Sequence, residues 1–462
     1  MYLNIDNAPK GRIACIDDSG SQLTYGDLCE FCKEFGRIIN HRTLVFIMST
    51  NTNASLLGYI ACLNNKVVPL IISANTDEEL FERFLQMYSP EYIWAPVGMK
   101  YLFERVYEID GYALFKTGNE SPELYEDLSL LLPTSGSTGS PKLVRHSYRN
   151  LEANAENVCK IFNIDETHRT MAQLPMHYTM GRSVIDSHLF GHATILLTGK
   201  PLTDKLFWKR LKEEQATSFT GVPYSYEILL KMRFERLDLP YLKIITQGGG
   251  KLTEDMFIKL ANYAKQKGKK FMPTYGQTEC SARMTYLPAE LASEKICSIG
   301  IAEPNTTLSI IDADGNESFE GEAVGEMVFR GENVTLGYAT CADDLNLGDD
   351  NHGVMHTGDI ARRDSDGCYY IVGRMKRFLK IFGLRIGLDE IENLVKAEFN
   401  VDCVSTGYDE LLRIYVTKED IIKDVKAFIC EKTHLYHNNV ETLYIEEIPR
   451  TETGKVKLQE LE

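Results

Sequence analysis

Residues 131–142 have the sequence LLPTSGSTGSPK, in which an apolar run leads into a loop of hydroxyls and glycines that ends at Lys142. Glycine geometry frees backbone N–H groups, and with hydroxyls and one cation these make a cradle for polyphosphate oxygens. The common nucleotide loop G-x-x-x-x-G-K-[ST] does not fit, because Gly136 and Gly139 are too close and no Ser or Thr follows the lysine. A flexible Gly/Ser linker has a similar composition, but it needs neither a buried strand before it nor Pro-Lys after it. We therefore expect this loop to bind phosphate.

The composition is that of a globular protein with more than one core. A chain of 462 residues is too long for one ordinary core, and 44% of its residues are hydrophobic, with a mean hydropathy of −0.22. Acidic residues number 66 and basic residues 50, so the net charge is −16. A field of that sign repels nucleic acids and anionic membranes, and we expect neither as a partner. An anionic substrate would need locally placed cations.

We expect a cytoplasmic protein without an integral membrane segment. No apolar stretch approaches the roughly 20 residues that span a bilayer. The first residues, MYLNID, lack the basic and apolar regions of a secretory signal. The 11 cysteines are scattered along the chain, and we expect them to be reduced thiols.

Hydrophobic patterns alternate between strand and helix through the first part of the chain. The patterns predict strands over 44–49, 67–72, 193–197 and 242–246, and helices over 53–64, 78–88 and 148–162. Ser147 is the expected cap of the last helix. Such alternation predicts α/β layers with parallel sheets.

The later part of the chain has a different pattern. Turn signals and short strands between Ser298 and Tyr338 predict an antiparallel subdomain, with strands over 308–312 and 326–330. Strand patterns over 403–408, 411–417 and 442–448, with a helix over 420–431, predict a small α+β unit. We therefore expect a large domain over residues 1–373 and a small mobile domain over 374–462, joined by a brief charged hinge.

Two further motifs carry groups suited to a nucleotide. TYGQTE at 274–279 follows a short apolar run, and Glu279 is an oxygen ligand of the kind Mg²⁺ uses when it also bridges phosphates. In the same motif Thr278 supplies a hydroxyl and Tyr275 a flat face for a base. HTGD at 356–359 ends a loop rich in Asp, and Asp359 could accept both hydroxyls of a ribose. Each motif alone could also be an ordinary turn.

A last candidate cation lies almost at the end of the sequence. PRTETGK occupies residues 449–455, so Lys455 is either a solvated charge or a cation delivered by the small domain.

Together these motifs resemble the adenylate-forming (AMP-binding) superfamily, which includes acyl-CoA synthetases, carrier-protein-loading adenylation domains and beetle luciferases. The resemblance runs from Thr134 to Lys455 with the motifs in the family's order. Further matching segments are GGGKL at 248–252, GE at 325–326, GY at 337–338, GR at 373–374, and KIFGLRI at 380–386. One motif alone would be weak, whereas several in register are specific.

The resemblance implies an acid–thiol ligase that uses ATP, Mg²⁺ and CoA. A carboxylate would be activated to an acyl-adenylate with release of pyrophosphate, and the acyl group would then pass to a thiol. The β- and γ-phosphates would be held by Thr134, Ser135, Gly136, Ser137, Thr138, Gly139 and Lys142. Adenine would lie between Tyr275 and the backbone of residues 248–250, which includes Gly249 and Gly250.

The remaining roles follow from the same resemblance. Thr278 would touch the α-phosphate, Glu279 would bind Mg²⁺, and Asp359 with Arg374 would hold the ribose. Lys455 would reach between the acyl carboxylate and the α-phosphate. After a rotation about Lys376, a loop containing Lys380 and Gly383 would guide the thiol.

The acid itself would lie among residues 176–181, 221–224 and 248–250. Domains that activate amino acids place an Asp near Tyr178, and no Asp or Glu stands there. Burying an unpaired ammonium costs several kcal/mol, so we expect an uncharged fatty or aryl acid. His177 would be a gate or wall of this pocket, or a simply packed histidine.

Two alternatives stay open. The thiol could belong to the phosphopantetheine of an acyl carrier protein instead of CoA, or the chain could be a nucleotide-binding interaction protein without catalysis. The joint presence of Lys142, Thr278, Glu279, Asp359 and Lys455 argues against the second. An oxygen-dependent luciferase has no distinguishing residue here.

Overall fold

The structure is a computed structural model that describes residues 1–99, 103–133, 142–375, 377–381, 384–408, 410–433, 435–451 and 456–461. The chain forms two compact units. Unit 1 comprises residues 1–308 and 329–355, and unit 2 comprises residues 309–328 and 356–462. No helix in the described part is both long enough and apolar enough to cross a bilayer.

A nine-stranded sheet forms one half of unit 1. Its order is β16 (Ile301–Ala302), β15 (Thr285–Tyr286), β14 (Lys270–Tyr275), β13 (Ile244–Gln247), β12 (Ser218–Gly221), β10 (Arg169–Ala172), β11 (Thr194–Leu197), β1 (Ile13–Ile16) and β2 (Gln22–Thr24). The strands from β14 to β1 are parallel, and antiparallel strands close both edges. The carboxyl ends of the parallel strands therefore meet at one edge of the sheet.

An eight-stranded sheet forms the other half of unit 1. Its order is β20 (Gly337–Ala339), β9 (Leu143–Ser147), β8 (Leu128–Pro133), β4 (Val68–Ser73), β3 (Leu44–Ser49), β5 (Tyr92–Pro96), β7 (Tyr112–Lys116) and β6 (Glu104–Ile109). β8 and β9 are antiparallel, with Pro133 opposite Leu143. The predicted phosphate loop thus connects two adjacent strands. Strand β9 was not predicted, because Arg145 and His146 interrupt its apolar pattern although both are buried.

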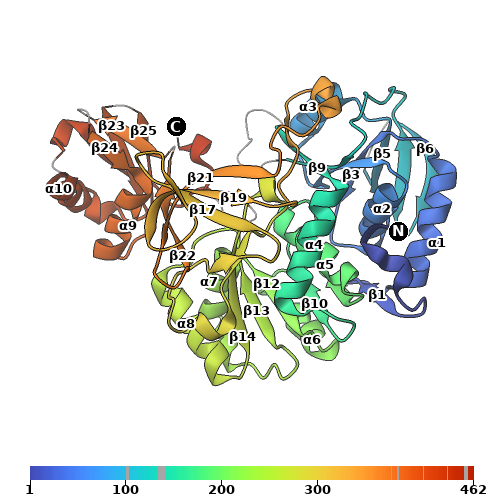
Figure 1. The fold of residues 1–462 in the computed structure, drawn as a ribbon, viewed down its shortest axis with the longest axis horizontal. Coiled ribbons are helices and arrows are strands. Elements are labelled where there is room, and N and C mark those ends of the chain that lie inside the picture. Colours follow the sequence, from blue (N-terminus) through green and yellow to red (C-terminus); the bar gives the residue numbers. More distant parts are fainter. Residues whose placement is uncertain are drawn as a thin grey trace. The chain divides into compact units, whose positions relative to one another are not determined.

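Helices fill the space between the two sheets and cover their outer faces. One apolar core joins both sheets through α1 (Tyr25–Ile38), α2 (Asn53–Asn64), α4 (Tyr148–Phe162) and α5 (Thr179–Phe190). A second core lies between the eight-stranded sheet and α3 (Glu78–Tyr88). A third lies between the nine-stranded sheet and α6 (Lys205–Glu213), α7 (Pro223–Lys231) and α8 (Glu254–Gln266). Figure 1 shows α4 and α5 between the two sheets.

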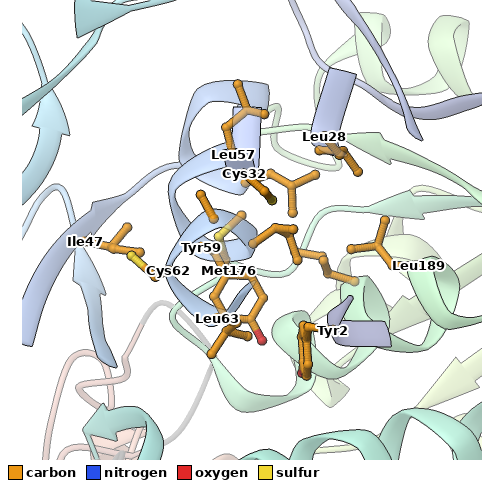
Figure 2. Close-up of a cluster of buried hydrophobic side chains, with 14 of the residues drawn as sticks. Tyr2, Leu28, Cys32, Ile47, Leu57, Tyr59, Cys62, Leu63, Met176 and Leu189 are labelled. Carbon is orange, nitrogen blue, oxygen red and sulfur yellow. The ribbon is translucent and has the colours of Figure 1, made fainter. Parts of the chain in front are cut away.

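The sequence explains why α2 lies in the middle of this arrangement. Every residue from Asn53 to Leu63 is buried, as expected of a helix that is apolar on all sides. Successive residues of β3 face different cores, with Val45 in the central one and Phe46 in the outer one. Figure 2 shows part of the central core, including Leu28 and Cys32 of α1, Tyr59 and Cys62 of α2, and Met176 and Leu189.

Unit 2 contains a sheet with antiparallel strand pairs and a small α+β fold. The five-stranded sheet has the order β18 (Glu317–Ser318), β17 (Thr307–Ile311), β19 (Ala323–Arg330), β21 (Val354–Arg363) and β22 (Tyr369–Arg374). The rest comprises β23 (Phe378–Ile381), β24 (Leu384–Gly387), α9 (Leu388–Phe399), β25 (Cys403–Tyr408), β26 (Leu411–Val416), α10 (Ile422–Thr433) and β27 (Val440–Tyr444). The C-terminal elements share an apolar core of their own.

The predicted fold class is confirmed. Parallel α/β layers, short strands after residue 298 and a C-terminal α+β fold are all present. The helix over 148–162 begins at a capping box in which the Ser147 side chain accepts from the Asn150 N–H. The compact units group the five-stranded sheet with the C-terminal fold, and the domain boundary after residue 373 stays a prediction.

Candidate active site

Four segments of unit 1 gather at the carboxyl edge of the nine-stranded sheet. They follow the parallel strands β10, β12, β13 and β14, and comprise residues 173–178, 221–224, 248–250 and 275–279. Gly248 N–H donates to the Gly221 carbonyl at 3.2 Å, which ties two of them together. This edge is where open parallel sheets usually bind ligands.

The turn after β14 has a strained and closely packed backbone. Ser281 and Ala282 have φ values of 59° and 119°, a region that side chains other than glycine disfavour. A Cβ at Gly276 would lie 1.5 Å from the Ala282 carbonyl oxygen, so only glycine fits there. The Arg182 guanidinium donates to the Ser281 carbonyl at 2.8 Å and so ties the turn to the helix over Thr179–Phe190.

Glu279 is held at both its backbone and its carboxylate. Its carbonyl oxygen accepts from the Thr335 N–H at 3.0 Å and from Thr335 Oγ1 at 2.9 Å. Its Oε1 accepts from the Tyr338 hydroxyl at 2.8 Å. The Lys142 ammonium lies 3.3 Å from the centre of the Tyr338 ring. A carboxylate and a cation are thus placed around one tyrosine.

Three other polar residues of the TYGQTE motif contact one another or α5. The hydroxyls of Thr278 and Thr179 are 2.9 Å apart, and Gln277 Nε2 donates to the Tyr275 hydroxyl at 3.0 Å. All four side chains belong to unit 1. The start of α5 therefore lies directly against the predicted nucleotide motif.

An apolar wall separates the start of α5 from residues 248–250. Tyr178 and Met180 pack with Leu174 and Val222 in one small cluster. Gly249 has a φ of +78°, and a Cβ there would lie 2.3 Å from the Tyr178 hydroxyl. Glycine is required at this position for both conformation and space. Burial raises the pKa of Tyr178 to about 12, so its hydroxyl stays neutral.

His177 is neutral and held in one tautomer. Its Nδ1 lies 3.2 Å from Ser49 Oγ, whose hydroxyl donates to the Ile72 carbonyl. Because that hydroxyl has a single hydrogen, Ser49 accepts from the His177 Nδ1–H, and Nε2 is the ring nitrogen without a proton. Burial lowers the pKa of His177 from 6.5 to about 4. Ser49 ends β3, so both sheets contribute to this edge.

Buried and partly buried polar residues that the sequence analysis missed support these segments. Asn51 Nδ2 donates to the Leu174 carbonyl, and its Oδ1 accepts from the Met176 N–H, each at 3.2 Å. Arg182 forms a fully buried ion pair with Asp186. Asp186 also accepts from the hydroxyls of Tyr2 and Tyr59, at 3.3 and 3.0 Å.

A weak signal for such residues was present in the sequence. Arg145 and Arg182 are charged residues within apolar or helical patterns, and a buried charge must be paired. Tyr338 and Thr335 stand in or beside the Gly337-Tyr338 motif, but nothing in that motif assigned them a partner. Their contacts to Glu279 depend on the tertiary fold.

Unit 2 holds the second predicted nucleotide motif. Asp359 and Arg374 are paired across β21 and β22, and Arg374 Nε lies 3.0 Å from Asp359 Oδ1. The Asp359 side chain is 4% exposed and that of Arg374 is 62% exposed. The motif at 356–359 lies within β21 rather than at the end of a loop, and pairing with β22 begins at its last residue, Asp359.

The remaining predicted residues are described only in part. Lys380 lies in β23, opposite Arg385 of β24. The residues outside the described ranges are Thr134, Ser135, Gly136, Ser137, Thr138, Gly139, Lys376, Gly383 and Lys455.

The model of the AMP-binding enzyme family matches residues 4–339, more than half of the chain. The chain belongs to this family. Among AMP-binding enzymes, the long-chain-fatty-acid–CoA ligase of Salmonella typhimurium is 30% identical over 355 residues, which are 73% of this chain and 61% of that protein. The indoleacetate–CoA ligase of Aromatoleum aromaticum is 28% identical over 342 residues, 71% of this chain and 65% of that protein. The chain thus spans less than two thirds of these curated relatives.

The fold is also that of solved AMP-binding enzymes. The o-succinylbenzoate CoA synthetase MenE of Bacillus subtilis, in complex with the acyl-adenylate OSB-AMP, has a TM-score of 0.80 at 18% identity, with 100% of this chain and 97% of that chain covered. The anthranilate CoA ligase AuaEII, in complex with anthranoyl-AMP, has a TM-score of 0.77 at 17% identity, with 100% and 96% covered. At this identity the similarity concerns the fold alone.

Proposed function

We propose that this AMP-binding enzyme activates a carboxylic acid with ATP and transfers the acyl group to the thiol of CoA. The observation that carries the proposal is that Lys142, Thr278 and Glu279 lie together in unit 1. Glu279 accepts from the hydroxyl of Tyr338, and Lys142 contacts the ring of the same tyrosine. Both curated relatives described above carry the name of a CoA ligase, which supports it.

In the first half-reaction, the acid carboxylate attacks the α-phosphorus and pyrophosphate leaves. Lys142 and the loop at 134–139 would hold the β- and γ-phosphates, where charge accumulates on the leaving group. Thr278 would donate to the α-phosphate, and Tyr275 with Gly249 and Gly250 would flank adenine. Such catalysis consists of positioning and charge stabilisation.

Glu279 fits a role as a Mg²⁺ ligand. Its Oε1 accepts from a neutral hydroxyl, and within the described residues no hydrogen bond engages Oε2. A carboxylate with one oxygen available suits Mg²⁺, which usually takes one or two carboxylates together with phosphates and waters. When bound, the metal would neutralise the charge that develops on the phosphates.

The acid pocket would be lined by His177, Tyr178, Met180, Val222 and Gly248. These are apolar or neutral side chains, and His177 stays uncharged because burial lowers its pKa to about 4. The segments proposed to surround the acid hold no acidic side chain that could pair an ammonium. An uncharged fatty or aryl acid is therefore the substrate class we propose.

The C-terminal residues would complete each half-reaction. We assign Lys455 to the gap between the acid carboxylate and the α-phosphate, Asp359 and Arg374 to the ribose, and Lys380 with Gly383 to the path of the thiol. A lysine between two anions lowers their mutual repulsion, and losing such a donor costs on the order of 10²- to 10³-fold in rate.

The test is adenylation measured across a panel of fatty, aryl and amino acids. Pyrophosphate exchange and hydroxylamine trapping report the first half-reaction, and addition of CoA or of a phosphopantetheinylated carrier protein reports the second. We expect turnover with a fatty or aryl acid and thioester formation with CoA. ATP binding without turnover on any acid would favour a non-catalytic protein, and thioester formation with the carrier protein alone would favour a loading enzyme.

Lys455→Ala tests the C-terminal assignment within the same assay. Pyrophosphate exchange should fall by about 10²- to 10³-fold, whereas thiol transfer from a preformed adenylate should fall much less. Lys457→Ala is the matched control, because Lys457 pairs with Glu460 at 2.7 Å. Normal exchange in the Lys455 variant would contradict the assignment.

A further inference from the structure

Strand pairing places Tyr338 beside Lys142, the first residue that the structure describes after the predicted phosphate loop. β20 runs antiparallel to β9, with Tyr338 opposite Val144. Val144 is two residues after Lys142, where the described chain resumes beyond the loop. The pairing therefore brings Tyr338 next to the end of the loop, although about two hundred residues separate them in sequence.

The backbone of Tyr338 is fixed by a buried arginine. Arg145 Nε donates to the Tyr338 carbonyl at 2.9 Å, and a second nitrogen donates to the Leu336 carbonyl at 3.2 Å. The Arg145 side chain is fully buried and also pairs with Asp350. The Tyr88 hydroxyl donates to the next carbonyl, that of Ala339, at 3.1 Å. A tyrosine anchored in this way can position its own side-chain partners.

The side chain of Tyr338 has two partners with opposite charge. Its hydroxyl donates to Glu279 Oε1 at 2.8 Å, while the face of its ring lies 3.3 Å from the Lys142 ammonium. Burial and the nearby Glu279 carboxylate raise the pKa of Tyr338, so the phenol remains a neutral donor. Thr335, three residues earlier, holds the backbone carbonyl of Glu279. One short segment thus holds Glu279 at its backbone and at its carboxylate.

We propose that Tyr338 is a positioning residue for both Glu279 and Lys142, an inference that rests on the proposed function of those two residues. The hydroxyl donates to Oε1 and fixes the carboxylate rotamer, so that Oε2 would be the oxygen offered to Mg²⁺. The ring face holds the ammonium where the polyphosphate arrives. The hydroxyl of Tyr338 therefore acts on metal binding and its ring acts on phosphate binding. Substitutions that remove one or both groups can separate these two effects.

Tyr338→Phe removes the hydroxyl and keeps the ring. Outer-shell partners of a metal ligand are commonly worth about 10- to 100-fold in metal affinity, so Mn²⁺ should bind the complex with a non-hydrolysable ATP analogue that much more weakly. Electron paramagnetic resonance of free Mn²⁺ measures this binding without turnover. Affinity for a fluorescent ATP analogue in EDTA should stay unchanged, because the ring still faces Lys142.

Tyr338→Leu removes both halves of the side chain. The loss of Mn²⁺ affinity should match that of the phenylalanine variant. In addition, metal-free nucleotide affinity should fall by about threefold, the size expected from losing one cation–π contact. If this variant does not fold, the phenylalanine variant alone still tests the hydroxyl.

Tyr88→Phe is the matched control, because it loses a tyrosine hydroxyl bond to the same strand but does not touch Glu279. It should bind Mn²⁺ as the wild type does. Mn²⁺ affinity in Tyr338→Phe within twofold of wild type, or an equal loss in Tyr88→Phe, would overturn the inference. If the wild type itself binds no Mn²⁺ with the nucleotide, the proposed function of Glu279 fails, and the inference fails with it.

Discussion

The two carboxylates proposed to face the nucleotide lie in opposite settings. Glu279 in unit 1 is partly exposed, and its carboxylate accepts from the neutral Tyr338 hydroxyl. Asp359 in unit 2 is buried, and its carboxylate is already paired with Arg374 at 3.0 Å. One keeps its charge available, whereas the other shares its charge with a cation.

This difference matches two different tasks. A metal ligand must offer uncompensated negative charge, because Mg²⁺ gives up its water reluctantly. A carboxylate that binds ribose hydroxyls needs acceptor oxygens in a fixed place, and a paired guanidinium supports that without blocking every lone pair. The comparison therefore predicts that neutralising Glu279 is far more costly than neutralising Asp359.

The largest effect should come from Glu279→Gln. The amide keeps the size of the side chain and an oxygen for Tyr338, but it removes the charge. We expect pyrophosphate exchange to fall by about 10²- to 10³-fold, the usual cost of losing one charge-stabilising group. Glu332→Gln is the control, since its carboxylate is an exposed partner of Arg149. If Glu279→Gln kept activity within threefold of wild type, the charge of Glu279 would not be needed and the comparison would fail.

A second prediction concerns the burial of the unit 1 site. Burial lowers the pKa of His177 from 6.5 to about 4. Between these two pH values His177 is protonated in the unfolded chain but not in the folded protein. The stability that neutral His177 contributes is therefore fully present above about pH 6.5 and is lost as the pH falls toward 4. From about pH 7 to pH 5 this histidine should lower the free energy of unfolding by roughly 2 kcal/mol.

Urea unfolding at both pH values measures this contribution. His177→Gln should lose less stability on acidification than the wild type, whereas His352→Gln, which alters an exposed histidine, should behave like the wild type. An equal loss of stability in the His177 variant would mean that this histidine does not titrate differently in the folded protein.

Much of the fold followed from local patterns. The helix at 148–162 was predicted to the residue because its cap, its periodicity and its end are all local. β3 was equally clear, since all six of its residues are buried and apolar or small. β10 and β12 were missed because each has only four residues, with Arg, Thr or Ser among them. Their strand structure comes from neighbours far away in sequence.

In the candidate site, sequence motifs single out only the groups that we propose to face the ligand. Thr278, Glu279 and Asp359 carry chemistry that a short motif reveals. Tyr338 and Asn51 contact residues that are distant in sequence and that only the tertiary fold brings close, so no motif could assign them. A short motif can suggest which residues meet a ligand, whereas the residues that contact them from distant segments appear only in the folded chain.

The third prediction tests the weaker side of the comparison. Asp359→Asn keeps the shape of a buried side chain but weakens charge-assisted hydrogen bonds to the ribose, each worth about 1.5 kcal/mol or more. We expect the KM for ATP to rise by about tenfold, with a smaller change in kcat and none in the KM for the acid. Asp314→Asn, in an exposed turn, should leave all three unchanged. A rise in the KM for the acid would place Asp359 elsewhere in the reaction.

The smallest effect should come from Arg374→Ala. Its side chain is 62% exposed, and exposed ion pairs contribute roughly 0 to 1 kcal/mol, so the KM for ATP should change by less than about fivefold. A double-mutant cycle with Asp359→Asn isolates the pair, and its coupling should fade in about 1 M salt, where charges are screened within roughly 3 Å. A coupling well above about 1 kcal/mol that persisted in high salt would mean that the guanidinium is a buried partner in the working enzyme. The charge of the Asp359 carboxylate would then be compensated more strongly still, and its contrast with the Glu279 carboxylate would be larger than proposed.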